Sequence, residues 1–229
     1  MRTLPFVAIT VGALLLPLTA PAGIESITAS DSVAALKTAL NQGTAHAVES
    51  LGVTNGFLKN PKVKIPLPPT LEKAESAMRL FGMGDQADAL VVAMNRAAEA
   101  AVPEAKTLLV KAVKQMTVDD ARQILTGGDD AATQYFRKVS YDKLEQKFLP
   151  IVKEHTDKVA LSQQYNQFVG QAARYGLVGS ADANVEGYVT RKALDGLFTM
   201  IAAEERAIRK DPLGQSSKIL EKVFGAIKL

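Results

Sequence analysis

The sequence predicts an all-α protein, a compact orthogonal bundle of about nine helices with one proline-rich extended strap. Apolar residues recur at helical spacing over most of the chain, while no segment forms a convincing strand. Capping residues, glycine and proline separate the helical segments by short connections. Since 47% of the 229 residues are hydrophobic, we expect one domain with a sizeable core over residues 23–229.

Residues 1–22 have the features of a cleavable secretory signal peptide. Arg2 gives a positive start, residues 4–18 are apolar, and Ala20-Pro21-Ala22 is a small-x-small cleavage signal. The apolar run is interrupted by proline and falls short of the roughly 20 residues that span a membrane. An uncleaved N-terminal anchor is the alternative. No other segment reaches membrane length, so we expect a soluble mature chain without an integral membrane segment.

The first helix is predicted from Ser30 or Asp31 to the residue before Gly52. Its apolar stripe consists of Val33, Leu36, Leu40, Ala47, Val48 and Leu51. Residues 53–69 follow as the extended strap, because several prolines forbid a helix there. Its apolar residues alternate with polar ones and predict one buried face: Val63, Ile65 and Leu67 against Lys62, Lys64 and Pro66.

Short helices fill the middle of the predicted bundle. They span residues 70–81, 85–102, 103–116 and 117–126, and Thr117 with Asp120 resembles a capping box. Further helices begin at Asp129 or Asp130 and at Ser140, and Pro150 should kink or divide the helical pattern, which continues to about Arg174. After a loop over 176–183, a long helix covers 184–210 and a last helix ends at Ile227.

Composition excludes several classes of function. With 27 Lys+Arg against 24 Asp+Glu the formal charge is +3, and 26 against 24 leaves +2 once Arg2 is removed with the leader. There is no long basic block, so we do not expect a nucleic-acid partner. The absence of cysteine excludes thiol catalysis, Cys-zinc sites, disulfides and a lipid anchor at cysteine.

Three segments carry a family resemblance: residues 94–99, residues 120–136 with the run Gly127-Gly128-Asp129-Asp130, and residues 188–198. Together with Lys64-Ile65-Pro66-Leu67-Pro68 they make the chain similar, from about residue 36 to 224, to a bacterial secreted family catalogued as domain of unknown function 4197. The resemblance implies an exported helical domain in bacteria with an outer membrane. It implies no activity, cofactor or catalytic residue.

The Gly127-Gly128-Asp129-Asp130 run is the most distinctive motif. In cyclic-dinucleotide synthases a Gly-Gly-Asp motif tips a β-hairpin, whereas here it stands between two helices, and an exported protein lacks nucleotide substrate. We therefore interpret the run structurally: glycine ends one helix and an aspartate accepts hydrogen bonds from the free N–H groups of the next. A cation or polar-ligand site that uses both carboxylates is the alternative, although calcium needs more oxygens.

Other polar residues also have two interpretations. Asn95, Arg96 and Glu99 share a helix face, which indicates a solvated face, an interhelical bridge or a cluster facing a cleft. Glu204 falls in the apolar stripe of the C-terminal helix, where a buried carboxylate needs a partner such as Arg96, Arg122 or Arg191. Glu205 and Arg209 are expected to pair at the surface. The candidate ligand-binding residues are Asn95, Arg96, Glu99, Arg122, Asp129, Asp130, Arg191, Asp195 and Glu204.

The two histidines, His46 and His155, belong to no catalytic motif, and His155 is expected at the core edge. There is no zinc-protease, nucleophile-elbow, phosphate-loop or dinucleotide signature, so we predict no metal or cofactor. The leading hypothesis is a non-catalytic periplasmic module that binds a protein or an envelope ligand; an extracellular location is the alternative. A carboxylate/arginine enzyme acting on envelope material would need Glu99, Asp129, Asp130 and Glu204 in one pocket. An apolar-ligand carrier would enclose lipid within the bundle.

Overall fold

The computed structural model describes residues 29–82, 84–160, 162, 163, 165, 166 and 184–210, and this part of the chain is helical without strands. The all-α prediction is confirmed. The helices are α1 (Ala29–Leu51), α2 (Pro69–Leu80), α3 (Gly84–Ala101), the 3-10 helix η1 (Val102–Glu104), α4 (Ala105–Gln115), α5 (Val118–Thr126), α6 (Ala131–Thr156) and α8 (Val185–Lys210). The predicted leader, the loop over 176–183 and the last helix lie outside the described residues.

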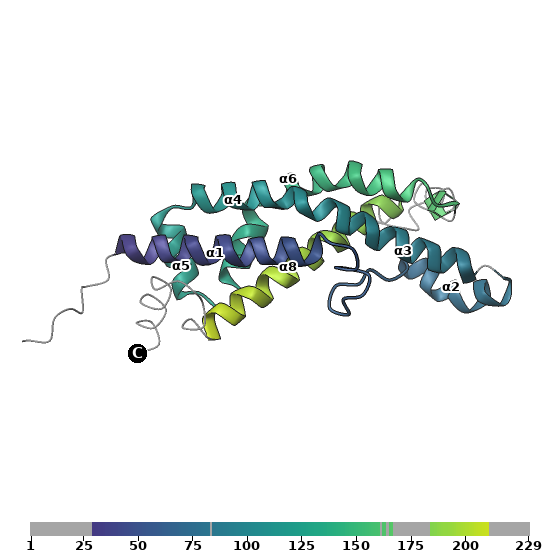
Figure 1. Ribbon diagram of the computed structural model, residues 1–229, viewed down its shortest axis with the longest axis horizontal. Coiled ribbons are helices and arrows are strands. Elements are labelled where there is room, and N and C mark those ends of the chain that lie inside the picture. Colours follow the sequence, from purple (N-terminus) through teal and green to yellow (C-terminus); the bar gives the residue numbers. More distant parts are fainter. Residues whose placement is uncertain (1–28, 83, 161, 164, 167–183, 211–229) are drawn as a thin grey trace, which may run out of the picture.

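The helices form an elongated bundle (Figure 1). Helices α1, α4 and α6 run along its long axis, α8 crosses them obliquely, and the hairpin of α2 and α3 makes one end. The expected orthogonal arrangement is therefore wrong. Within the described part of the chain, no helix is long and apolar enough to cross a membrane.

The described residues also hold fewer helices than the nine that we predicted, mainly because α6 is continuous. It begins after Asp130 and passes through Ser140 and Pro150, where the sequence suggested new helices. Proline removes one backbone hydrogen bond. Phe148 and Val152, which flank Pro150, are fully buried, and the packing of this stripe holds the helix together across the proline.

The core lies around α8, which packs against α1, α3 and α6. Helical spacing predicts a core stripe on α8 of Val189, Ala193, Leu197, Met200, Ile201 and Ile208. All of these residues are buried except Met200, which is half-buried, so the prediction is largely confirmed. Four phenylalanines are among the largest fully buried side chains: Phe57, Phe136, Phe148 and Phe198. At the edge of this core His155 is half-buried, as expected.

The segment between α1 and α2 is extended only over residues 64–68, because turns occupy most of residues 52–63 and α2 begins at Pro69, so the prediction of an extended strap over 53–69 is wrong in its extent. Its predicted apolar face is confirmed. Val63, Ile65 and Leu67 are buried, whereas the residues between them are exposed. Phe57 in its first turn is also fully buried and meets Gly196 of α8, where an added Cβ would lie 2.6 Å from Cε1 of the ring. The strap therefore depends on a glycine of α8 for its closest approach to the bundle.

Candidate functional site

The junction between α5 and α6 contains the most distinctive sequence motif. Helix α5 begins with the predicted capping box: the Asp120 N–H donates to Thr117 Oγ1 over 3.1 Å, and the Thr117 N–H donates to Asp120 Oδ2 over 2.9 Å. Both contacts satisfy N–H groups that the first helical turn leaves free. The helix ends at Thr126, directly before the glycine pair.

The two glycines of the motif have different environments. A Cβ at Gly127 would lie 2.7 Å from the carbonyl oxygen of Gln123 and 2.7 Å from Cβ of Ala131. A Cβ at Gly128 would meet nothing within 4 Å. Only the first glycine is therefore required for the chain to pass closely between α5 and α6.

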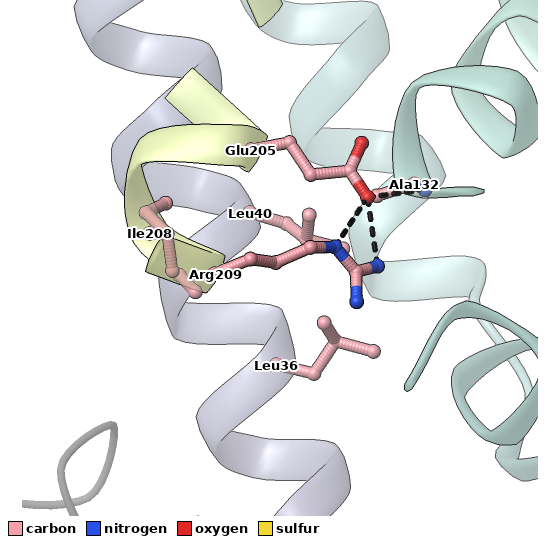
Figure 2. A pocket seen from close by; sticks show the side chains of 7 residues that line it. Leu36, Leu40, Ala132, Glu205, Ile208 and Arg209 are labelled. Atoms are coloured by element: carbon pink, nitrogen blue, oxygen red, sulfur yellow. Dashed lines mark hydrogen bonds and ion pairs between the residues drawn. The ribbon is translucent and has the colours of Figure 1, made fainter. Parts of the chain in front are cut away.

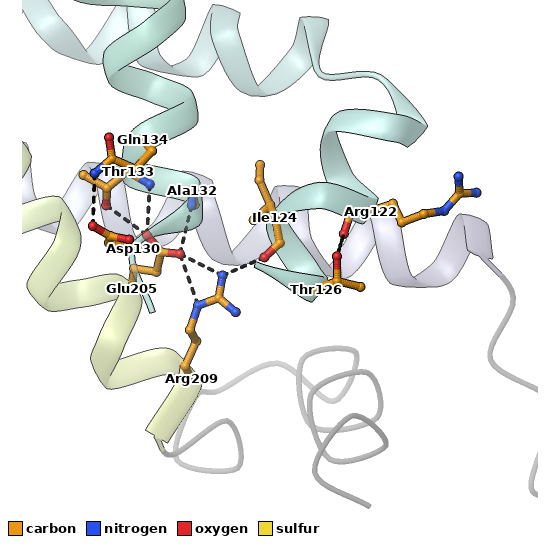
Figure 3. Close-up of polar contacts among 9 residues, drawn as sticks. All are labelled: Arg122, Ile124, Thr126, Asp130, Ala132, Thr133, Gln134, Glu205 and Arg209. Atoms are coloured by element: carbon orange, nitrogen blue, oxygen red, sulfur yellow. Dashed lines mark hydrogen bonds and ion pairs between the residues drawn. The ribbon is translucent and has the colours of Figure 1, made fainter. Parts of the chain in front are cut away.

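The aspartates of the motif do not cap α6, contrary to our expectation. Asp130 occupies the N-cap position without a side-chain cap, and its carboxylate accepts instead from Gln134 Nε2 over 3.0 Å. The N–H groups of Ala132 and Thr133 donate to the carboxylate of Glu205, each over 2.9 Å, as does the Thr133 hydroxyl (Figure 3). Helix α6 is thus capped by a residue from α8, which satisfies the same N–H groups that the prediction assigned to an aspartate.

Arg209 completes this contact, and we name the pair Glu205–Arg209 the α8 clasp. The guanidinium donates to Glu205 Oε1 over 3.1 and 2.8 Å and to the carbonyl oxygen of Ile124 over 2.8 Å. Figure 2 shows both side chains between α8 and the start of α6. They are only 5% and 17% exposed, so the predicted pair exists but the expected surface position is wrong. The clasp joins the end of α5 and the start of α6 to α8.

Of the adjacent glutamates near the end of α8, the buried one is thus Glu205 rather than Glu204. Glu204 lies one residue, or about 100°, around the helix. Its Oε1 is 2.7 Å from His46 Nδ1, and the side chains of Glu204 and His46 are 24% and 67% exposed. The predicted arginine partners of Glu204 are therefore wrong.

The polar face of α3 binds the strap. Asn95 is fully buried and pairs with Ile65 in both directions, donating to its carbonyl oxygen over 2.8 Å and accepting from its N–H over 2.9 Å. Glu99 accepts from the N–H groups of Phe57 and Leu58 over 3.0 and 3.1 Å. This face is neither solvated nor an interhelical bridge; it holds non-helical backbone against the bundle.

Arg96 supports this docking from the side. It pairs with Glu99 and donates to Asn55 Oδ1 over 2.9 Å. Asn55 is in the left-handed region with φ 74°, a conformation that asparagine tolerates better than most residues. The carboxylate of Glu99 is thus used by two backbone amides and one guanidinium, and the three predicted residues on α3 act together on the strap.

The remaining candidates lie elsewhere. Arg122 pairs with Asp119 over 3.1 Å at the surface of α5. Asp195 accepts from Arg137 over 3.2 Å, Arg191 is half-buried, and Asp129 is exposed between α5 and α6. The structure therefore distributes the nine candidate residues among the strap, the α5–α6 junction and α8, instead of gathering them around one site.

A hollow of about 300 Å³ opens between α5 and α6, and we name it the motif hollow. Its lining residues are Asp120, Gln123, Ile124, Ala131, Gln134, Tyr135 and Lys138. All except Lys138 belong to the segment 120–136 that carries the family resemblance. The most distinctive part of the sequence therefore supplies nearly the whole surface of this hollow.

The charges in the motif hollow follow from its contacts. Hydrogen bonds from the Thr117 hydroxyl and N–H lower the pKa of Asp120, and the nearby Lys138 ammonium lowers it further. Burial raises the pKa of Tyr135, and the Asp120 carboxylate adds to this effect. The hollow thus combines a carboxylate whose pKa is lowered with a phenol whose pKa is raised.

Sequence reasoning missed Gln123, Gln134, Tyr135 and Lys138 as a group. A signal was present, because Gln134 and Tyr135 lie four and three residues before Lys138 and so share one face of a helix. Gln123 comes from a different helix, and only the packing of α5 against α6 brings it to the same hollow.

The apolar pockets beside the α8 clasp are small. The pocket in Figure 2 is lined by side chains of α1 and α8 and by Ala132, and its volume is about 20 Å³. A neighbouring pocket holds about 10 Å³. The larger of the two has room for about one water molecule, not an acyl chain. Among the described residues, no group of three or more His, Asp or Glu side chains is arranged to hold a metal ion.

Comparison with known proteins gives one finding. A family model described as Protein of unknown function (DUF4197) matches residues 26–225. The chain belongs to this family. The match covers every described helix of this DUF4197 protein, including the motif hollow and the α8 clasp, and confirms the resemblance. No curated protein and no solved structure matches the chain.

Proposed function

We propose that this DUF4197 protein is an exported, non-catalytic binding module of the periplasm, and that the motif hollow is its binding site. One observation carries the proposal: the segment 120–136, which carries the family resemblance, lines a hollow of about 300 Å³. This volume is at the lower end of those that ligand pockets occupy. The segment thus combines a structural junction with a shaped polar surface.

The contacts of the carboxylates favour binding over catalysis. A carboxylate enzyme would need Glu99, Asp129, Asp130 and Glu204 in one pocket, and Asp129 is exposed at the α5–α6 junction. Glu99 instead holds strap amides, Asp130 accepts from Gln134, and Glu204 pairs with His46. An acid–base pair must reach the reacting group from both sides of one pocket. Each of the other three groups is used by a different structural contact, so the geometry gives no support to the enzyme hypothesis.

The lining residues indicate a polar ligand with both donors and acceptors. Lys138 supplies a positive charge, Asp120 a negative charge, and Gln123 and Gln134 supply carboxamides that donate and accept. Tyr135 is oriented by its hydroxyl, which donates to the carbonyl oxygen of Ala112 over 3.2 Å. Such a surface suits an envelope glycan, a peptide or a polar protein segment, rather than a lipid tail.

Crosslinking in the periplasm tests the binding role. The full chain is expressed in its own host with a photo-crosslinking residue at Gln123, and captured species are identified after irradiation. We expect one predominant captured species. In a chain that carries the crosslinker at exposed Gln146 of α6 instead, this species should be absent. A protein that remains uncaptured in every condition contradicts the proposal.

Variants show whether capture depends on the motif hollow. With the crosslinker at Gln123, which lines the hollow, Gln134→Ala/Lys138→Ala should reduce capture. Gln146→Ala/Lys158→Ala removes the same two kinds of side chain from exposed positions outside it and should not. Equal capture by both variants would place the binding surface elsewhere.

Location is tested on the same cells. Fractionation should recover the protein with periplasmic markers, and intact-mass measurement should give a chain that begins at Gly23. Recovery in the growth medium would support the extracellular alternative. A membrane-bound chain that retains residues 1–22 would show that the leader is an uncleaved anchor.

A further inference from the structure

A second hollow lies along the seam between α4 and α6. Its volume is about 290 Å³, and we name it the lysine hollow. It is lined by Leu108, Lys111, Ala112 and Gln115 from α4 and by Tyr135, Val139, Ser140 and Lys143 from α6. It shares only Tyr135 with the motif hollow, so the two are separate surfaces on either side of that ring.

Two positive charges line this hollow without an acidic partner. Lys111 and Lys143 approach it from opposite helices, no carboxylate lines it, and α4 contains no acidic residue. One turn further along α6, Lys147 pairs with Glu104 over 3.6 Å. Along this seam Lys147 therefore has a counter-charge, whereas Lys111 and Lys143 have none within the described part of the chain.

Apart from Gln115, whose side chain is exposed, the rest of the lining is apolar or already hydrogen-bonded. Leu108 is half-buried, Ala112 is buried, and Val139 is 38% exposed. The hydroxyls of Tyr135 and Ser140 donate to backbone carbonyl oxygens over 3.2 and 2.6 Å. The hollow thus offers an apolar floor beneath two ammonium groups, with few free hydrogen-bonding groups between them.

We propose that the lysine hollow binds an anionic amphiphile, a molecule with a phosphate or carboxylate head and a short apolar part. The head lies between Lys111 and Lys143, where it replaces the repulsion between two like charges by two attractions. The apolar part covers Leu108 and Val139. A bare anion gains little from exposed lysines, because solvent screens each pair, so the apolar contact is needed for specific binding.

Titration of the mature chain with octyl phosphate, below its micelle concentration, tests this site. Backbone amide signals of residues 108–115 and 135–143 should shift in a saturable way, and added salt should weaken binding. Octyl glucoside has the same tail and a neutral head, whereas inorganic phosphate has the charge without the tail. Each of these two compounds should bind at least about tenfold more weakly than octyl phosphate. Equal binding of octyl glucoside, or no saturable shift with octyl phosphate, overturns the proposal.

Matched variants separate a built site from general attraction to a basic helix. Lys111→Gln/Lys143→Gln should weaken octyl phosphate binding by about tenfold. Lys106→Gln/Lys114→Gln removes the same charge from the other two lysines of α4, which do not line the hollow and of which Lys106 pairs with Glu49, and should change binding less than about twofold. Circular dichroism checks that both variants are folded. An equal loss in the two variants would overturn the proposal.

Vesicles distinguish the two sources of such a ligand. Co-sedimentation with phosphatidylglycerol vesicles that is lost in Lys111→Gln/Lys143→Gln supports recognition of lipid within a bilayer. Binding of octyl phosphate without co-sedimentation supports recognition of free amphiphiles. Because the lysine hollow and the motif hollow share only Tyr135, failure here leaves the crosslinking test of the proposed function unaffected.

Discussion

At the scale of single residues, Glu205 illustrates how a buried charge is stabilised. Its carboxylate accepts from two backbone N–H groups and from the Thr133 hydroxyl, and Arg209 supplies the counter-charge. Burying a carboxylate is costly unless it is both paired and hydrogen-bonded, and both conditions are met here. Removal of the carboxylate would leave the α6 N–H groups without their acceptor and Arg209 with the Ile124 carbonyl oxygen but no counter-charge.

Glu205→Ala is therefore expected to lower the free energy of unfolding by about 3–5 kcal/mol, the usual cost of breaking a buried pair. Urea denaturation followed by circular dichroism measures the change. Glu204→Ala is the control, because it removes the neighbouring carboxylate from a partly exposed pair and should cost less than about 1 kcal/mol. Similar losses at the two positions would show that the clasp contributes no special stability.

The glycine pair gives a second comparison at this scale. Gly127→Ala should cost about 1–3 kcal/mol, because its Cβ would lie 2.7 Å from a carbonyl oxygen and from Ala131. Gly128→Ala meets open space and should change stability by less than about 1 kcal/mol. Thermal unfolding of both variants is the measurement, and a larger loss at Gly128 would contradict the geometry.

At the scale of helices, the capping box links the stability of α5 to pH. The pKa of Asp120 is lowered in the folded chain, so its carboxylate stabilises the protein fully above the unfolded pKa of about 3.9. This contribution is lost as pH falls further, through the folded pKa. Acid should therefore weaken α5 through Asp120.

The expected measurement is a difference between variants. Asp120→Asn should be less stable than the native chain by a constant amount from pH 7 to about pH 5, and the difference should shrink below about pH 4. Urea unfolding at each pH gives these values. Asp119→Asn removes an equal charge from the same helix outside the capping box, so a matching pH dependence there would rule out the box as the cause.

Helix positions were easier to predict than helix faces. The strap, the capping box and the stripe of α8 follow from local sequence, because proline, threonine and apolar spacing act over a few residues. The sequence placed Glu204 in the core, whereas the structure buries Glu205. The two positions differ by a rotation of about 100° around the helix axis, and packing rather than spacing decides which of them faces the core. The prediction that Pro150 kinks or divides the helix was wrong, because the sequence alone does not show how deeply Phe148 and Val152 are buried.

The candidate site was predictable only as a segment. Residues 120–136 stand out in the sequence, and they line the motif hollow. The prediction named Arg122, Asp129 and Asp130 of this segment, whereas its residues in the lining include Asp120, Gln123, Gln134 and Tyr135. The α8 clasp was beyond local reasoning, since Glu205 and Ala132 are 73 residues apart.

At the scale of the whole molecule, the strap and α8 meet where Gly196 faces Phe57. Gly196→Ala should cost about 1–3 kcal/mol, because the new Cβ would lie 2.6 Å from the ring and 3.2 Å from Cβ of Val63. In the double variant Gly196→Ala/Phe57→Leu the smaller side chain should recover part of this loss. A double-mutant cycle on unfolding free energies measures the coupling, and strictly additive losses would contradict the contact.

The docking of the strap on α3 has a kinetic consequence. Asn95 meets Ile65 across 30 residues and Glu99 meets Phe57 across 42, and both polar side chains are correctly spaced only when α3 is already helical. We therefore expect the strap to fold after α3 and to open before it. Native-state hydrogen exchange should find the amides of Phe57 and Ile65 released together, at a lower opening free energy than the amides of α3 itself.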